Sequence, residues 1–255
     1  MFVDSHAHIY SSEFDIDRSE IINLSLEKDV KKIYMPNVDS SSIDRMLEAE
    51  DRYKGICIPM MGLHPCSVGK NFEKSLYEVE AWLNKRKFAA VGEIGIDLFH
   101  DVSFFEQQKE AFLIQVQWAI DYKMPIVIHC RNSFRETVDA LSKFEKGKIK
   151  GVFHCFSGTL EEAHEVIDMG FYLGIGGVAT FKNGGLDKVI PEIELEHIVL
   201  ETDSPYLAPA PFRGKRNHPG YIPLVAEKIA TYKNVGLEEI AEITTANIDK
   251  VFAKV

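Results

Sequence analysis

The chain has 255 residues, of which 45% are hydrophobic and 27% are charged, and its formal net charge is −10 at pH 7. This length is close to that of one (β/α)8 barrel, and the composition is ordinary for a globular protein. The negative charge argues against a non-specific duplex binder, whose affinity comes from a broad basic surface. It does not exclude an enzyme that takes a phosphate into a local pocket.

Short apolar runs alternate with longer helical patterns eight times along the chain, without a repeat or a linker. The runs that predict strands are Phe2–Ile9, Lys32–Val38, Gly55–Leu63, Ala89–Ile96, Pro125–Cys130, Lys150–Phe156, Phe171–Val178 and Ile198–Thr202. The clearest helical patterns are Phe105–Tyr122, Ser133–Phe144, Glu161–Met169 and Leu237–Val251. Most of the predicted strands are Val- and Ile-rich without polar alternation, which is typical of parallel sheets buried on both faces. We expect an α/β fold, a (β/α)8 TIM barrel formed by residues 1–255 as a single domain, with an open doubly wound sheet as the alternative.

An acid and two histidines stand at alternate positions in the first apolar run, as Asp4, His6 and His8. Side chains at i, i+2 and i+4 of a strand leave the same face, so these three point in one direction. Later runs end in the same residue types. These further strand-end residues are His64, Glu93, His129, His154, Glu201 and Asp203. Because the active sites of barrels lie at the carboxyl ends of the strands, the pattern predicts a metal site at one rim.

The residue types indicate which ions this rim binds and how. Imidazole and carboxylate donors without thiolate suit Zn, Mn, Fe or Mg. The predicted metal ligands are His6, His8, Glu93, His129, His154 and Asp203. Six ligands exceed what one four-coordinate catalytic ion uses, so we expect two divalent ions (Mg, Mn or Zn) bridged by Glu93. Asp203 is expected to bind one ion and to take the proton of the attacking water, which makes Glu93 and Asp203 the predicted catalytic residues.

Other polar residues near the rim have less direct predicted roles. We expect Asp4, one step deeper on its strand, to support a ligand histidine. His64 is predicted to contact a substrate phosphate in preference to a metal. Asp97 is predicted either to cap the next helix or to orient a ligand. A lone histidine in a loop or helix is usually not a ligand, and we assign no role to His100, His164 and His197.

A basic loop follows the last predicted strand and covers residues 211–219. Arg213 and Arg216 suit bidentate contacts with phosphate oxygens, and Lys215 adds a point charge. This loop favours phosphate esters over neutral amides as substrates. The full set of predicted substrate contacts is His64, Glu201, Arg213, Lys215, Arg216 and Asn217. Phe212 and Tyr206 are interpreted as stacking on a base or as packing residues.

The cysteines and the chain start indicate the cellular compartment. Cys57, Cys66, Cys130 and Cys155 form no C-x-x-C pair, so a thiolate zinc motif is not predicted. Cys130 and Cys155 each follow a histidine on a predicted strand and face away from it toward the helices, so we expect buried, reduced thiols, which suit a cytoplasmic protein. No segment approaches the ~18–20 apolar residues of a membrane helix, and the N-terminus lacks the basic and apolar regions of a signal peptide.

Taken together, the strand-end motifs resemble the TatD family of metal-dependent deoxyribonucleases. The matching segments are Asp4-Ser-His6-Ala-His8, Gly62-Leu-His64-Pro65, Gly92-Glu93-Ile-Gly95, Ile128-His129-Cys130-Arg131, His154-Cys-Phe-Ser-Gly158, Glu201-Thr-Asp203-Ser-Pro205, Arg213-Gly-Lys-Arg-Asn217 and Thr244-Thr-Ala-Asn247. They cover essentially the whole chain in the family's order.

The resemblance implies a (β/α)8 barrel of the amidohydrolase-like group and a metal-dependent phosphodiesterase that acts on DNA with 3′–5′ exonuclease polarity. Its ligand positions coincide with the six residues named above, and Glu93 stands where many members of the wider group have a carboxylated lysine. It implies DNA, as a 3′ end or a single strand, as the partner, with no obligate protein partner. The chain departs from the family pattern at His218 and at Leu98-Phe99. Both departures bear on substrate preference.

Two rival functions remain at this point. One is hydrolysis of another ester, such as D-aminoacyl-tRNA, by the same metal site. The other is a metal-binding scaffold without turnover, which is disfavoured because a degenerate site usually loses a ligand or the base at Asp203.

Overall fold

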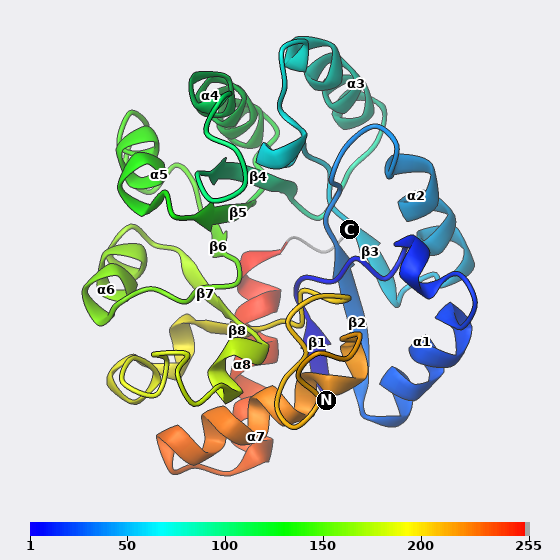
Figure 1. Cartoon of the computed structure of the whole chain (residues 1–255), viewed down its shortest axis with the longest axis vertical. Coiled ribbons are helices and arrows are strands. Elements are labelled where there is room, and N and C mark those ends of the chain that lie inside the picture. Colours follow the sequence, from blue (N-terminus) through cyan, green and yellow to red (C-terminus); the bar gives the residue numbers. More distant parts are fainter. Residues whose placement is uncertain (253–255) are drawn as a thin grey trace.

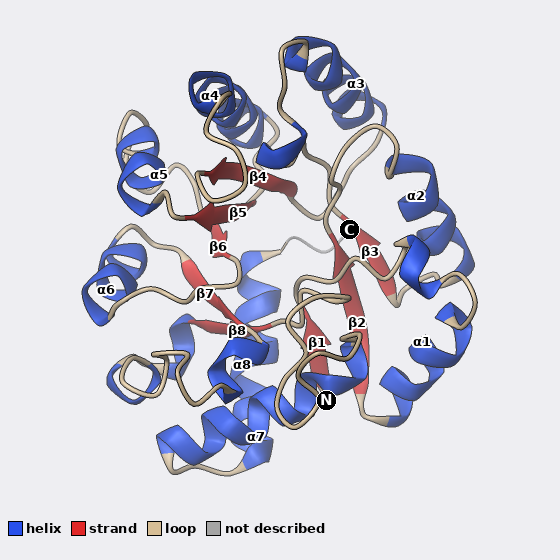
Figure 2. Cartoon of the chain, in the orientation of Figure 1, coloured by secondary structure: helices blue, strands red, loops and turns tan. Residues whose placement is uncertain are grey.

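Short parallel strands form the inside of the molecule and helices surround them (Figures 1 and 2). The computed structural model describes residues 1–252. The strands are β1 (Phe2–Asp4), β2 (Val30–Met35), β3 (Cys57–Pro59), β4 (Val91–Asp97), β5 (Ile126–Arg131), β6 (Gly151–Phe153), β7 (Tyr172–Ile175) and β8 (Ile198–Leu200). The helices are α1 (Arg18–Glu27), α2 (Ile43–Arg52), α3 (Phe72–Lys85), α4 (Phe105–Asp121), α5 (Phe134–Leu141), α6 (Leu160–Asp168), α7 (Ile222–Lys233) and α8 (Leu237–Val251).

The strands form two parallel sheets, β1-β2-β3 and β4-β5-β6-β7-β8. Two isolated parallel bridges join the sheets into a barrel: Met61 pairs with Val91 at one junction, and Ala7 pairs with Ser204 at the other. Backbone hydrogen bonds reinforce the second junction, where the amide of Asp203 donates to the carbonyl of His6. The order of the strands around the ring therefore follows the sequence, as in a (β/α)8 barrel.

The apolar residues separate into an outer and an inner core. The outer core lies between strands and helices and includes Phe112 and Val116 on the inward face of α4. The inner core gathers residues from the strands, including Val127 and Val199, against the end of α8. There Phe252 stacks on Tyr34 with ring centroids 4.5 Å apart. The end of α8 thus closes the amino-terminal end of the barrel, which leaves the carboxyl end for the polar groups.

The sequence prediction of a barrel is confirmed, and the open-sheet alternative is wrong. The predicted bounds of the last helix, Leu237–Val251, agree with α8. The predicted strands are too long, however. The run Phe2–Ile9 was predicted as one strand, yet β1 ends at Asp4. Beyond Asp4 the chain leaves the regular ladder because its backbone bonds to two neighbours in turn: Ser5 donates to Leu200, and Ala7 donates to Tyr34.

Candidate metal centre

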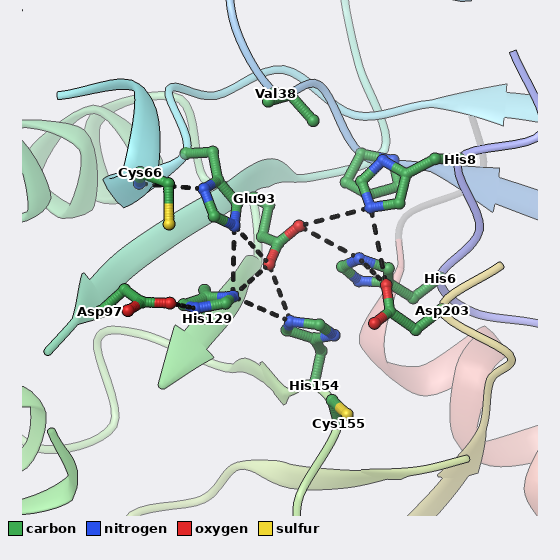
Figure 3. A network of polar contacts seen from close by, with 12 residues as sticks. His6, His8, Val38, Cys66, Glu93, Asp97, His129, His154, Cys155 and Asp203 are labelled. Carbon is green, nitrogen blue, oxygen red and sulfur yellow. Dashed lines mark hydrogen bonds and ion pairs between the residues drawn. The ribbon is translucent and has the colours of Figure 1, made fainter. Parts of the chain in front are cut away.

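The polar centre at the carboxyl end of the barrel is built around Glu93, which is 1% exposed (Figure 3). Its two carboxylate oxygens face different groups of side chains. Oε2 lies 3.2 Å from Nε2 of His6 and 3.7 Å from Nε2 of His8. Oε1 lies 2.7 Å from Nε2 of His154, 2.8 Å from Nδ1 of His129 and 3.3 Å from Nε2 of His64. One carboxylate thus connects two sets of nitrogen donors.

Asp203 completes the set on the Oε2 side. Its Oδ1 lies 3.7 Å from Nε2 of His6 and 3.6 Å from Nε2 of His8. The residue adopts a left-handed backbone conformation, φ 54°, which is sparsely populated by residues other than glycine and recurs at functional sites. Burial raises the pKa of its carboxyl, but His8, His154 and His6 outweigh this and hold the pKa below its ordinary value. Asp203 is therefore a carboxylate with 15% of its side chain exposed.

Asp4 shapes the chain beneath these ligands. Its Oδ1 accepts hydrogen bonds from the backbone amides of His6 and Thr202, and its Oδ2 accepts one from the Thr202 hydroxyl. It therefore supports the backbone that carries His6 and not the imidazole. Burial outweighs these three hydrogen bonds and raises the pKa of Asp4 to about 8.

The hydrogen bond between His8 and Tyr10 determines which ring nitrogen of His8 carries the hydrogen. The hydroxyl of Tyr10 donates to the carbonyl of Pro36 over 2.6 Å, so its oxygen accepts from Nδ1 of His8 over 3.0 Å. A neutral His8 ring then carries its hydrogen on Nδ1 and a lone pair on Nε2. That lone pair points toward Glu93 and Asp203.

His129 and His154 have carboxylates behind them. Nε2 of His129 donates to Oδ2 of Asp97 over 2.8 Å, which leaves a lone pair on Nδ1 toward Glu93 when the ring is neutral. Nδ1 of His154 faces Oε1 of Glu201 at 3.5 Å, and the same oxygen accepts from the amide of Cys155 over 2.5 Å. Carboxylate–histidine pairs of this kind are typical of metal centres, where they fix the tautomer of the ligand.

A glycine creates the space for Glu201. A Cβ atom at Gly174 on β7 would lie 2.2 Å from Oε2 of Glu201, so only glycine at this position allows the carboxylate to sit beneath His154. Asp97 has the orienting role predicted as one of two alternatives. It does not cap α4, whose N-cap residue is Phe104.

The ring of His64 differs from those of His8 and His129, because its hydrogen is on the nitrogen that faces the centre. Its Nδ1 accepts a hydrogen bond from the amide of Cys66 over 3.0 Å. A neutral His64 ring therefore carries its hydrogen on Nε2, the atom that faces Glu93 and lies 3.2 Å from Nδ1 of His129. A nitrogen that bears hydrogen donates to an oxygen and does not coordinate a metal.

The donor set fits a metal. Both ring nitrogens of His6 are buried and have no hydrogen-bond partner within residues 1–252, although Nε2 points at two carboxylates. In their neutral forms, the rings of His8, His129 and His154 direct a lone pair into the same space. The donor atoms of His6, His8 and Asp203 lie within 4.8 Å of one another, as do those of His6, Glu93 and His154. Imidazole and carboxylate in this combination are donors to divalent ions.

The charges of the protein groups hold the centre in its ionised form. Burial raises the pKa of Glu93, but His154, His64 and His6 outweigh this and bring it well below its ordinary range. Burial lowers the pKa of His154, but Glu93 and Glu201 outweigh this and raise it well above its ordinary value. A carboxylate surrounded by imidazoles is thus favoured in its charged state.

A cavity of about 1070 Å³ opens from this centre and is lined by Glu93, Asp203 and four basic side chains. These basic residues are Arg45, Arg131, Arg213 and Lys215. The net charge of the chain is negative, but this concave surface concentrates positive charge.

Two of the basic-loop residues, Arg213 and Lys215, line the cavity as predicted. Arg216 does not: its guanidinium pairs with Asp17 and bonds the carbonyl of Glu13. Asn217 is fully buried and donates to the carbonyls of Thr202 and Tyr206. Arg216 and Asn217 therefore hold the loop in place, and the structure does not bring these two predicted substrate contacts to the cavity.

Glu201 is fully buried beneath His154 and does not line the cavity, so the structure does not bring this predicted substrate contact to the cavity either. Phe212 and Tyr206, the aromatic residues near the loop, have different surroundings. Phe212 stacks on Tyr221 with centroids 4.6 Å apart and is a packing residue, whereas Tyr206 lines the cavity. The departure at His218 is buried against Tyr221 and is not part of the cavity lining.

Sequence reasoning missed three residues at this site. Tyr10 continues the alternation of His6 and His8 by two positions, which was the available signal. Arg131 follows the predicted strand Pro125–Cys130 directly, and its guanidinium lies 4.1 Å from the ring centroid of Phe99. Arg45 lies on α2, and no sequence signal connects it to the rim.

Comparisons with known proteins agree over the whole chain. A family model described as TatD related DNase matches residues 3–253. The uncharacterized metal-dependent hydrolase YabD of Bacillus subtilis is 38% identical over 253 residues, which cover 99% of each chain. Human deoxyribonuclease TATDN3 is 29% identical over 266 residues, which cover 99% of this chain and 94% of the human protein.

The crystal structure of YJJV, a TatD homolog from Escherichia coli, superposes with a TM-score of 0.92 at 29% sequence identity. The superposition covers 98% of this chain and 97% of that one. In the described part of the chain, no helix is both long and apolar enough to cross a membrane.

Proposed function

The chain belongs to the family of TatD-related DNases. We propose that it is a divalent-metal-dependent deoxyribonuclease that hydrolyses phosphodiester bonds from the 3′ end of DNA. One observation carries the proposal. The two oxygens of Glu93 face two sets of imidazoles at the base of a cavity lined by arginine and lysine side chains. This combination suits a phosphodiester, which needs cationic contacts and an activated water.

In the proposed arrangement Glu93 would serve as a ligand in both of two divalent-ion sites. His6, His8 and Asp203 would hold one ion, and His129 and His154 would hold the other. When bound, such ions lower the pKa of a water molecule and stabilise the charge on the phosphoryl oxygens. Mg²⁺, Mn²⁺ and Zn²⁺ all accept these donors.

The protein groups have separate roles in this proposal. The carboxylate of Asp203 takes the proton of the attacking water, because it is ionised and partly exposed to the cavity. Nε2 of His64 donates to a phosphate oxygen of the substrate, as the tautomer of this ring requires. Arg213 and Lys215 bind the phosphates that flank the cleaved bond.

The size of the cavity favours the end of a strand. Its volume of about 1070 Å³ lies just above the usual range of small-molecule pockets and leaves room for a few nucleotides. Tyr206 and Leu207 are exposed beside the cationic residues and offer apolar contacts to an unstacked base. A single-stranded 3′ end is therefore the preferred substrate in this proposal.

The test is degradation of a 3′-overhang oligonucleotide by the purified protein in Mg²⁺, in Mn²⁺ and in EDTA, with Glu93→Ala as the inactive comparison. Labels on the 5′ and the 3′ ends in separate reactions give the polarity. We expect metal-dependent shortening from the 3′ end that EDTA and the substitution abolish. DNA that stays intact with every metal, together with hydrolysis of D-aminoacyl-tRNA, would overturn the nuclease assignment. Bound metal with no hydrolysis of any ester would identify a scaffold instead.

A further inference from the structure

A second cluster of metal-binding side chains lies at the rim of the cavity, outside the central donor set. It consists of Cys66 in the short helix Pro65–Ser67, Asp97 at the end of β4 and His100 in the loop that follows. Nδ1 of His100 is 2.8 Å from Oδ2 of Asp97 and 3.7 Å from Sγ of Cys66. The three ligand atoms all lie within 4.8 Å of one another. In Figure 3 the sulfur of Cys66 points toward Asp97.

We propose that Cys66, Asp97 and His100 form a third metal site, which binds a divalent transition ion of the Zn²⁺ class. Sulfur, nitrogen and oxygen donors together select such an ion, because thiolate is a poor ligand for Mg²⁺ and a good one for Zn²⁺. Three protein ligands with a fourth position open to solvent are typical of accessible zinc sites. One thiolate and one carboxylate balance the charge of the ion.

The cluster is both accessible and held in place. Cys66 and His100 are exposed and line the cavity, so an ion reaches them from solvent. Asp97 has no exposed side-chain surface, and its Oδ1 accepts the amides of Phe99 and His100. The amide of Cys66 is in turn bonded to Nδ1 of His64. Two of the ligands therefore have their backbone fixed by neighbouring groups before an ion binds.

Metal binding at this site releases one proton to solvent and moves another within the ring of His100. The S–H bond of Cys66 breaks, and its proton leaves to solvent as the sulfur–metal bond forms. The neutral ring of His100 moves its hydrogen from Nδ1 to Nε2, so that the Nδ1 lone pair faces the ion. No electron is transferred, and the ion keeps its charge.

The rim site shares one atom, Oδ2 of Asp97, with the hydrogen bond that orients His129 in the central donor set. Oδ2 of Asp97 also accepts the hydrogen bond from Nε2 of His129. An ion bound to Oδ2 competes with that hydrogen bond. Occupancy of the rim is thus expected to alter the orientation of His129 and the metal affinity at Glu93.

The experiment is a Co²⁺ titration of the whole protein without DNA, followed by absorption spectroscopy. Cobalt bound to a thiolate gives a charge-transfer band in the near ultraviolet, whereas the central donor set is imidazole and carboxylate. The sulfur of Cys155 is directed away from that set (Figure 3). We expect the band in the wild-type protein, its loss in Cys66→Ser and its weakening in His100→Asn. Metal analysis after Zn²⁺ loading in excess Mg²⁺ is expected to show one equivalent fewer in Cys66→Ser.

The controls are Cys130→Ser and Cys155→Ser, which are expected to keep the band. A wild-type protein without the band, or Cys66→Ser with the band unchanged, would overturn the third site. Circular dichroism checks that the exposed substitutions at Cys66 and His100 leave the fold intact. Because the readout needs no hydrolysis, its outcome is independent of the proposed nuclease activity.

Discussion

Nε2 of His129 donates a hydrogen bond of 2.8 Å to Oδ2 of Asp97, a side chain without exposed surface. Because the carboxylate accepts, Nδ1 is the ring atom that is free to bind a cation. In Asp97→Asn, we expect the side-chain oxygen to keep accepting hydrogen bonds from the amides of Phe99 and His100. The NH2 group then takes the position of Oδ2 and faces Nε2 of His129. The ring must then reverse its tautomer. We expect the affinity for Mn²⁺ to fall ~10–100-fold, measured by calorimetry.

The control for this prediction is His100→Asn. It removes a neighbour of Asp97 but leaves the hydrogen bond to His129 in place. Its affinity for Mn²⁺ is expected to match that of the wild type, since an ion of this kind favours the central donors over the rim. Equal affinities for wild type and Asp97→Asn would show that Asp97 does not orient the ring.

Asp203→Asn separates proton transfer from metal binding. The amide keeps an oxygen near His6 and His8, but it cannot accept a proton from water. We expect turnover to fall by ~10²–10⁴-fold, the contribution of a positioned general base, while most of the bound metal remains. Single-turnover cleavage and metal analysis of the same preparation measure the two effects. Hydrolysis near the wild-type rate would exclude Asp203 as the base.

Tyr10→Phe tests the support of His8. The substitution removes the oxygen that accepts from Nδ1, and the buried ring nitrogen loses its partner. An unsatisfied buried donor costs ~1–3 kcal/mol, and the loss of an orienting partner lowers metal affinity ~10-fold or more. Thermal unfolding of the metal-free protein and calorimetry with Mn²⁺ report the two effects. Unchanged values in both measurements would show that Tyr10 is not needed to orient His8.

Arg213 and Arg216 provide a matched pair in the same loop. Arg213 lines the cavity, and its substitution by Ala is expected to weaken DNA binding and to reduce the salt dependence of log K by about 0.7 for one lost phosphate contact. Arg216 pairs with Asp17 and lies over Phe14. Arg216→Ala is expected to lower the melting temperature and to leave the salt dependence unchanged. Binding isotherms at several salt concentrations decide between these outcomes, and the reverse pattern would reassign the two residues.

The barrel and the convergence of the central residues were predictable from the sequence because both depend on periodicity. Buried parallel strands have a recognisable composition, and the end of each strand in a barrel meets the same rim. The strand-end positions alone predict that Glu93 lies between His6 and His154. The positions of its two oxygens confirm that the three residues lie together.

The substrate loop was harder to predict, because its side chains bond to backbone carbonyls. Arg216 and Asn217 look like phosphate ligands in a basic segment, yet their partners include the carbonyls of Glu13 and Thr202. The pattern of residue types in a sequence does not show which backbone carbonyl will accept a hydrogen bond from a given side chain. The buried position of Glu201 is hard to predict for a related reason. Whether a strand-end carboxylate faces the cavity or a neighbouring histidine depends on the space left by Gly174 on another strand.

The two junctions between the sheets have a consequence for how the chain is assembled. His6 and Asp203 meet across the junction of the first and last strands, and His64 and Glu93 meet across the other. A chain that has not joined its sheets has no complete set of donors. The ion proposed at His6, His8 and Asp203 would therefore find its full donor set only after the ring has closed, and it would link residues that are almost two hundred positions apart. In this respect the proposed cofactor acts as a late cross-link, which holds the finished ring against reopening as well as serving the reaction.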